Sequence, residues 1–342
     1  MKSNIKATEL ISRRTERGKV FAFLQGGYQY ISYSQQVHYK KASGAWREID
    51  NNLLKEGNSY TVKENPASFS FGTENAANVM RVEKNGRSIA WYPMGGQAAL
   101  SPIVINGSEL RAEWEKEQER TEQDRRENLL EKASRIVYKG ILPGVDIAYD
   151  LCGMGAQETV TAENAESLMR VGKSFTLGEG LSFTVKEGAV KITDEKTGER
   201  VFRIGASYLR DSKGECEYAL KPVVQKTEAG FTLDYDFTDI DTESLSYPVT
   251  IDPEYQCDRD NTAIKDTTIK QASPNTNYGS SDQGETGILS GNENRFLIRI
   301  ASLPAIPAGE AVVSSVLKIA GNASDYADPK YISAHEMTGT WA

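Results

Sequence analysis

Residues 230–253 read GFTLDYDFTDIDTESLSYPVTIDP. From Phe231 to Thr238, apolar and polar side chains alternate at every step. Successive side chains of a β-strand point to opposite faces of the sheet, so this pattern gives one buried face and one solvent-exposed face. The stretch predicts a half-buried strand of an antiparallel sheet.

Similar signals recur along most of the chain. Residues 174–205 read SFTLGEGLSFTVKEGAVKITDEKTGERVFRIG, in which glycine-containing turns separate short strand-like runs at regular spacing. Asn85-Gly86 is a strong hairpin signal, and residues 37–49, VHYKKASGAWREI, predict a second hairpin. We therefore expect a mostly β protein made of antiparallel β-sandwich domains.

One segment departs from this pattern. Residues 108–135, SELRAEWEKEQERTEQDRRENLLEKASR, contain neither glycine nor proline and are rich in Glu, Arg, Lys and Gln. These residues favour helix, but the middle of the segment lacks an apolar stripe. The segment predicts a charged, partly helical insertion between strands.

Composition limits the classes of partner and site. The 342 residues carry a formal net charge of -8, which argues against nucleic acid as the main partner because phosphate binding needs a basic surface. No stretch is apolar for long enough to span a bilayer, and the first residues lack the apolar core of a secretory signal. The three cysteines and two histidines form no disulfide framework or spaced metal motif.

The order of these signals predicts the domain organisation. Residues 1–18 form an N-terminal lead segment that precedes the first domain. Residues 19–253 form a β-rich domain interrupted by the charged insertion at 108–135. Pro253 ends a strand, and the polar residues that follow predict a linker at 254–262. Residues 263–342 then form a second β-domain.

Several stretches of the first domain resemble the N-terminal region of wall-associated RHS-repeat polymorphic toxins of Gram-positive bacteria. The resemblance is carried by ELISRRTERGKVF (9–21), VHYKKASGAWREIDNNL (37–53), IVYKGILPGVDIAYDL (136–151) and LSYPVTIDP (245–253). It implies an extracellular or cell-wall location, and a partner in the remaining RHS and toxin part of the same polypeptide. A signal peptide is expected to lie outside this chain.

The second domain resembles a DNRLRE-type module, a jelly-roll domain related to carbohydrate-binding modules. The resemblance rests on an opening strand at Asp266, a Ser273-Pro274 corner followed by Asn-Tyr-Gly, and the Arg-x-Leu-Ile-Arg strand from Arg295 to Arg299. It implies a jelly roll, which needs about eight strands. Fewer strands are predicted here, so we expect a partial, truncated jelly roll.

Together these resemblances imply a non-enzymatic β-module that binds cell-wall or other polysaccharide. One alternative is a purely structural scaffold that docks to the rest of its own toxin. Another is a fragment of a secreted glycan hydrolase or lyase, although nothing in the sequence marks a specific carboxylate pair.

Exposed aromatic and arginine side chains are the candidates for contact with sugar rings. In the second domain these are Tyr278, Arg295, Arg299, Tyr326, Tyr331 and Trp341. Each of the four aromatic residues has a competing interpretation as a residue of the core or of a loop anchor.

Residues 230–253 also contain clustered carboxylates, which hard cations prefer as ligands. Asp234, Asp236, Asp239 and Asp241 are the candidate ligands for Ca²⁺, the one cofactor that the sequence leaves open. The competing interpretation is a solvated strand face followed by a loop.

Overall fold

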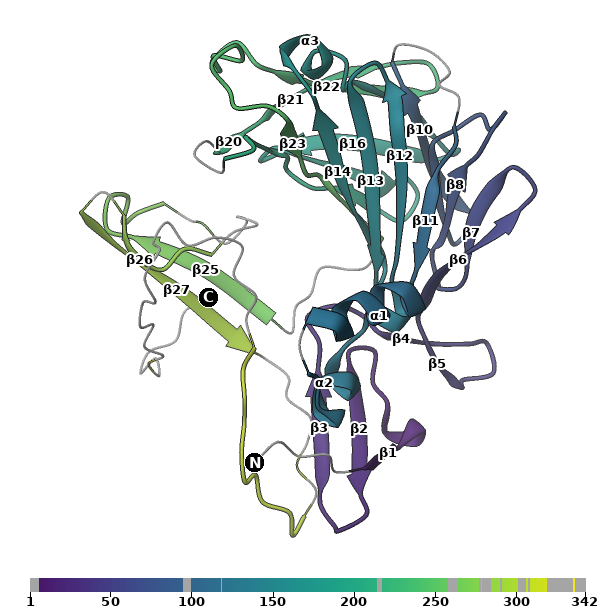
Figure 1. Ribbon diagram of the computed structural model, residues 1–342, viewed down its shortest axis with the longest axis vertical. Coiled ribbons are helices and arrows are strands. Elements are labelled where there is room, and N and C mark those ends of the chain that lie inside the picture. The colour runs from purple at the N-terminus through teal and green to yellow at the C-terminus, as the bar shows by residue number, and fades with distance from the viewer. Residues whose placement is uncertain are drawn as a thin grey trace. The chain divides into compact units, whose positions relative to one another are not determined.

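Antiparallel strands dominate the computed structural model of the chain (Figure 1). The structure describes residues 6–94, 100–117, 119–213, 217–257, 264–276, 278, 284–289, 291–300, 306, 308–318 and 335. The chain divides into two compact units, Met1–Asn261 and Thr262–Ala342. The mostly β fold class predicted from the alternating patterns is confirmed.

The first unit contains two large sheets. One has eight strands, in the spatial order β21 (Lys221–Lys226), β22 (Gly230–Asp236), β15 (Lys173–Leu177), β10 (Arg87–Pro93), β9 (Met80–Lys84), β8 (Ser68–Gly72), β7 (Ser59–Glu64) and β6 (Asp50–Glu56). The Asn85-Gly86 hairpin is confirmed, since it joins β9 to β10 with φ angles of 53° and 73°.

The other large sheet has eleven strands. Eight follow one path: β11 (Ile103–Asn106), β12 (Ser134–Leu142), β13 (Val145–Cys152), β14 (Gly155–Ala162), β24 (Glu254–Gln256), β18 (Arg200–Ile204), β17 (Ala189–Asp194) and β16 (Leu181–Lys186). The others are β19 (Tyr208–Arg210), β20 (Glu217–Ala219) and β23 (Val249–Ile251). A short helix, α3 (Ala165–Leu168), follows β14.

The buried faces of the two large sheets share one hydrophobic core. The ring of Phe71 on β8 lies 5.2 Å from that of Tyr149 on β13, and Phe231 on β22 lies 4.6 Å from Phe183 on β16. Each contact joins one sheet to the other, so the sheets pack face to face as a β-sandwich. On β22, Phe231 and Tyr235 are buried, as the alternating pattern predicts.

Smaller elements adjoin the sandwich within the same unit. A three-stranded sheet contains β1 (Ala7–Glu9), β2 (Gly18–Phe23) and β3 (Tyr28–Ser32), with the 3-10 helix η1 (Ile11–Arg13) between β1 and β2. The predicted hairpin at 37–49 is confirmed as β4 (His38–Lys40) and β5 (Trp46–Glu48).

The charged insertion is helical, as predicted, and lies between two paired strands. It contains α1 (Gly107–Glu117), α2 (Glu122–Glu127) and the 3-10 helix η2 (Leu130–Lys132), flanked by β11 and β12. Gly107 is required where α1 begins, because a Cβ there would lie 2.3 Å from the carbonyl oxygen of Glu131. No helix within the described ranges has both the length and the apolar character needed to cross a membrane.

Two predicted boundaries differ from the structure. β1 lies inside the predicted lead 1–18 and pairs with β2. β24 lies inside the predicted linker 254–262, because the chain resumes pairing directly after Pro253 and buries Tyr255. Such three-residue strands are too short to show an alternating pattern. The division into domains at 19–253 and 263–342 stays a prediction.

The described part of the second unit forms a three-stranded antiparallel sheet. Its order is β25 (Ile264–Lys270), β27 (Asn292–Ile300) and β26 (Gly287–Leu289). This sheet agrees with the β class.

Candidate functional site

A cluster of polar side chains lies in the core between the two large sheets. Nζ of Lys173 on β15 contacts Oε1 of Glu158 on β14, and these residues are 1% and 0% exposed. The hydroxyls of Tyr149 and Tyr255 donate hydrogen bonds to Oε2 of Glu158 at 2.6 and 3.3 Å. The ammonium also lies 5.3 Å from the centroid of the Trp91 ring. Both buried charges therefore have partners, without which burial would be prohibitively costly.

No motif in the sequence predicts this cluster, although one signal of it is present. Along β14, Ala156, Glu158 and Val160 all lie on the buried face. A carboxylate on an otherwise apolar face needs a buried partner. The sequence does not reveal that Lys173, which begins a strand of the opposite sheet, is this partner.

The two tyrosine hydroxyls of the cluster remain protonated at neutral pH. Burial, together with the nearby charge of Glu158, raises the pKa of the Tyr149 hydroxyl well above its ordinary value. The pKa of Tyr255 is raised for the same reasons. Both groups therefore act as hydrogen-bond donors to the carboxylate.

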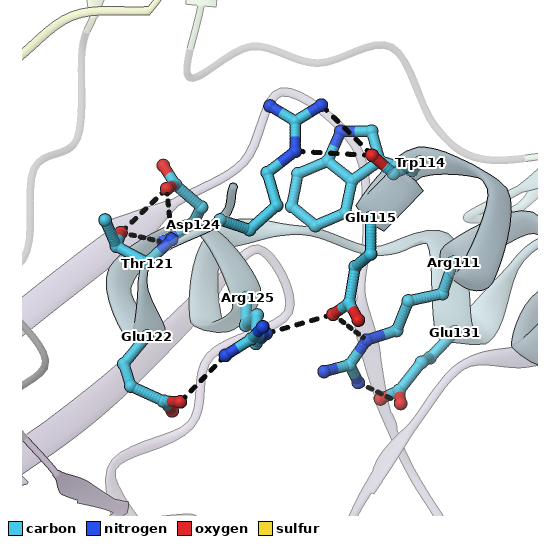
Figure 2. A network of polar contacts seen from close by, with 9 residues as sticks. Arg111, Trp114, Glu115, Thr121, Glu122, Asp124, Arg125 and Glu131 are labelled. Carbon is cyan, nitrogen blue, oxygen red and sulfur yellow. Dashed lines mark hydrogen bonds and ion pairs between the residues drawn. The ribbon is translucent and has the colours of Figure 1, made fainter. Parts of the chain in front are cut away.

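A second polar network lies on the insertion (Figure 2). Glu115 accepts hydrogen bonds from Nε of Arg111 at 3.1 Å and from Nε of Arg125 at 3.0 Å. These bonds hold the pKa of the Glu115 carboxyl below its usual range. The guanidinium of Arg120 lies 4.1 Å from the centroid of the Trp114 ring. The network stabilises the insertion and pairs Arg111 and Arg125 with carboxylates.

Thr121 begins α2 with a capping box, in which its Oγ1 accepts from the backbone N–H of Asp124 and its own N–H donates to the Asp124 carboxylate. Replacing Thr121 with alanine is expected to destabilise α2 by about 1 kcal/mol. The loss should appear as faster hydrogen exchange in residues 122–127, whereas Thr121→Ser retains the oxygen and should exchange like the wild type. Equal exchange in all three proteins would contradict this assignment.

His38 is a buried histidine near the N-terminal sheet. Its ring is 0% exposed, and Nδ1 lies 2.8 Å from the carbonyl oxygen of Thr15. Nε2 lies 3.9 Å from a carboxylate oxygen of Glu9. Burial, followed by the nearby charges of Arg14 and Lys19, holds the pKa of His38 below its usual value of 6.5. The folded protein therefore favours the neutral ring.

This lowered pKa predicts a loss of stability at acidic pH. Below pH 6.5 the unfolded chain protonates His38 while the folded chain resists, so the unfolded state binds more protons. The free energy of unfolding should therefore fall as the pH drops from 6.5 toward the folded pKa. Urea titrations of the wild type and His38→Gln across this range measure the effect, which the variant should lack. Parallel curves for the two proteins would show that His38 contributes nothing to the pH dependence.

An open, mostly polar groove lies at the edge of the eight-stranded sheet. Its volume is about 380 Å³, and its lining includes Lys55, Tyr60 and Glu74. The volume falls within the range of small-molecule sites. The lining contains one lysine and one glutamate, so it lacks the excess positive charge that binding a phosphate backbone needs.

The candidate sugar-contacting residues lie only partly within the described structure. Nζ of Lys270 sits 4.8 Å from the centroid of the Tyr278 ring, so one face of this ring is occupied. Arg295 and Arg299 are exposed on β27, and Nε of Arg295 pairs with Glu293 at 2.9 Å. Tyr326, Tyr331 and Trp341 lie outside the described residues.

The four candidate calcium ligands do not converge. Asp239 pairs with Lys221 at 2.6 Å, and Asp236 accepts from both the N–H and the hydroxyl of Thr238. Asp234 accepts from the backbone N–H of Tyr235, and Asp241 lies beyond the end of β22. In the part of the chain that the structure describes, no three His, Cys, Asp or Glu side chains are arranged to hold a metal ion.

No family model matches the chain. It is similar to tRNA nucleases. These include "tRNA3(Ser)-specific nuclease WapA" of Bacillus spizizenii, "tRNA nuclease WapA" of Bacillus subtilis and "tRNA(Glu)-specific nuclease WapA" of Bacillus subtilis subsp. natto. Each is 26% identical over 294 residues, which cover 81% of this chain. The chain spans 12% of the length of the first two relatives and 11% of the third.

These matches correct the family interpretation. The predicted combination of an RHS-type N-terminal region with a DNRLRE-type module is wrong, because no family model matches and the relatives found are named as WapA nucleases. The short motifs behind the interpretation, such as Ser273-Pro274, are turn and strand signals common to many β-proteins. The partial jelly roll expected for residues 263–342 stays a prediction.

The matches also overturn the functional expectations. A non-enzymatic, polysaccharide-binding module is contradicted because the relatives are named as enzymes, and the exclusion of nucleic acid is contradicted because their named substrate is tRNA. The net charge of -8 describes this chain, whereas the relatives are much longer polypeptides whose total charge it does not report.

Proposed function

We propose that this chain is a folded part of a longer polypeptide that cleaves tRNA. The observation that carries the proposal is the match at 26% identity over 294 residues to proteins named as tRNA nucleases. Because it covers 81% of the chain, the match must include most of the sandwich unit Met1–Asn261. A similarity of this extent supports a shared architecture rather than a shared local motif.

The proposed activity is that of the whole polypeptide. This chain spans 12% of the first relative, so the sandwich accompanies the cleaving chemistry within a much larger protein. The paired arginines of the insertion and the balanced charges of the Lys55 groove give no strong attraction for phosphates. The extracellular or cell-wall location expected from the sequence belongs to this proposal.

A tRNA-cleavage assay tests the proposal. The complete gene product and residues 1–342 alone are purified and incubated with total tRNA, and the products are separated on a denaturing gel. We expect the complete product to give discrete tRNA fragments. Intact tRNA after incubation with a complete product that melts cooperatively would overturn the proposal. Cleavage by residues 1–342 alone would show that the residues that cleave tRNA lie within this chain.

A further inference from the structure

The buried Lys173–Glu158 pair connects the two halves of the sandwich. Lys173 begins β15 in the eight-stranded sheet, whereas Glu158 lies in the middle of β14 in the eleven-stranded sheet. Their side chains are 2% and 0% exposed, so water has almost no access to either. By contrast, the ion pair between Arg87 on β10 and Asp194 on β17, which also joins the two sheets, has side chains that are 29% and 11% exposed.

The surroundings divide the two oxygens of the carboxyl group between different partners. Oε1 contacts the amine, while Oε2 accepts from the hydroxyl of Tyr149 at 2.6 Å and of Tyr255 at 3.3 Å. The Trp91 ring centroid also lies 5.3 Å from Nζ. The amine is therefore confined against the carboxyl group, and two donors point at the oxygen that it does not touch.

This arrangement matches the requirements for forming an amide. An amine attacks a carboxyl group only when the amine is neutral and the acid is protonated. In a dry interior, transfer of one proton from the ammonium to the carboxylate removes both charges and the cost of burying them. Confinement of the two groups replaces a bimolecular encounter with a reaction inside one molecule.

We propose that Lys173 and Glu158 form an intramolecular isopeptide bond that joins the two sheets. Nζ attacks Cδ of the protonated Glu158, and negative charge develops on Oε2, where the hydroxyls of Tyr149 and Tyr255 stabilise it by hydrogen bonding. The Cδ–Oε1 bond then breaks as Oε1 receives a proton from Nζ and leaves as water. One C–N bond replaces one C–O bond, and the step needs no oxidant, reductant or other reactant.

Tyr149 and Tyr255 are the catalytic residues of this step, since they contact the reacting carboxyl group. Their raised pKa keeps both hydroxyls protonated, so they can donate throughout the reaction. The role is independent of tRNA cleavage, and it concerns only how this unit is held together.

The intact mass of the purified, denatured chain tests the bond. We expect the wild type to weigh one water molecule less than its sequence requires. Trypsin should then fail to cut after Lys173 and should yield a branched product in which residues 140–170 are joined to residues 171–186. A wild-type mass equal to that of the sequence, with free peptides 140–170 and 171–173, would overturn the proposal.

Two variants separate the chemistry from mere packing. Lys173→Arg keeps a positive charge beside Glu158 but removes the primary amine, so its mass should equal that of its sequence. Tyr149→Phe keeps the ring and removes one donor, and it should slow the loss of water in freshly synthesised protein by about a hundredfold. Loss of water from Lys173→Arg would show that Lys173 does not form the bond. An unchanged rate in Tyr149→Phe would overturn the catalytic role of Tyr149.

Discussion

Replacing Lys173 with methionine is expected to lower the free energy of unfolding of the sandwich by about 3–5 kcal/mol. Methionine fills a similar volume but leaves the carboxylate of Glu158, which is 0% exposed, without a cation. The remaining partners are the hydroxyls of Tyr149 and Tyr255, and these cannot neutralise its charge. Urea unfolding followed by tryptophan fluorescence measures the loss relative to wild-type protein in which Lys173 and Glu158 are still an unreacted ion pair. This magnitude does not include the proposed covalent bond.

The matched control is the double variant Lys173→Met with Glu158→Gln. Glutamine keeps an oxygen that can accept from Tyr149 but carries no charge, so most of the lost stability should return. A single variant as stable as the wild type would mean that the buried pair contributes nothing to folding. A double variant less stable than the single would mean that packing, not charge, explains the loss.

Replacing Phe231 with alanine should cost about 3–5 kcal/mol, because the change opens a cavity in the shared core. Phe231 is 0% exposed and stacks on Phe175 at 4.7 Å within its own sheet. It also lies 4.6 Å from Phe183 of the opposite sheet, so truncation removes contacts on both sides. Thermal and urea unfolding should both report the change.

Val223 provides the control for this change. It lies on β21 at the edge of the same sheet and is 41% exposed, so Val223→Ala should alter the free energy of unfolding by less than about 0.5 kcal/mol. Equal losses for the two variants would argue against a core shared by the two sheets at this end of the sandwich.

Much of the fold could be predicted from local patterns. The alternation from Phe231 to Thr238, the Asn85-Gly86 turn and the charge-rich run at 108–135 each specify an element without reference to distant residues. The pairing of β14 with β24 could not be predicted in this way, since it joins residues about a hundred positions apart through a three-residue strand. Short strands gain their stability from neighbours, which the local sequence does not reveal.

The site was harder to predict than the fold. Candidate residues such as Tyr278 and Asp236 were chosen because aromatic rings and carboxylates suit known ligands, yet the structure shows each of them in contact with a neighbouring side chain. Lys173 and Glu158 have no motif around them, and only three-dimensional packing brings them together. A single charged residue on an apolar strand face, such as Glu158 on β14, indicates a buried partner that the local sequence does not identify.

The insertion leaves and re-enters the sheet at paired positions, since Asn106, the last residue of β11, lies opposite Ser134, the first of β12. The pairing of β11 with β12 is therefore compatible with insertions of different length. The entropic cost of closing the insertion rises only slowly with its number of residues. Its outer end instead contacts the N-terminal sheet, where Arg126 lies over Phe21 and Phe23. Lengthening or exchanging this segment, by evolution or by engineering, would change one surface of the unit and the support of its first strands. The core beneath could remain as it is.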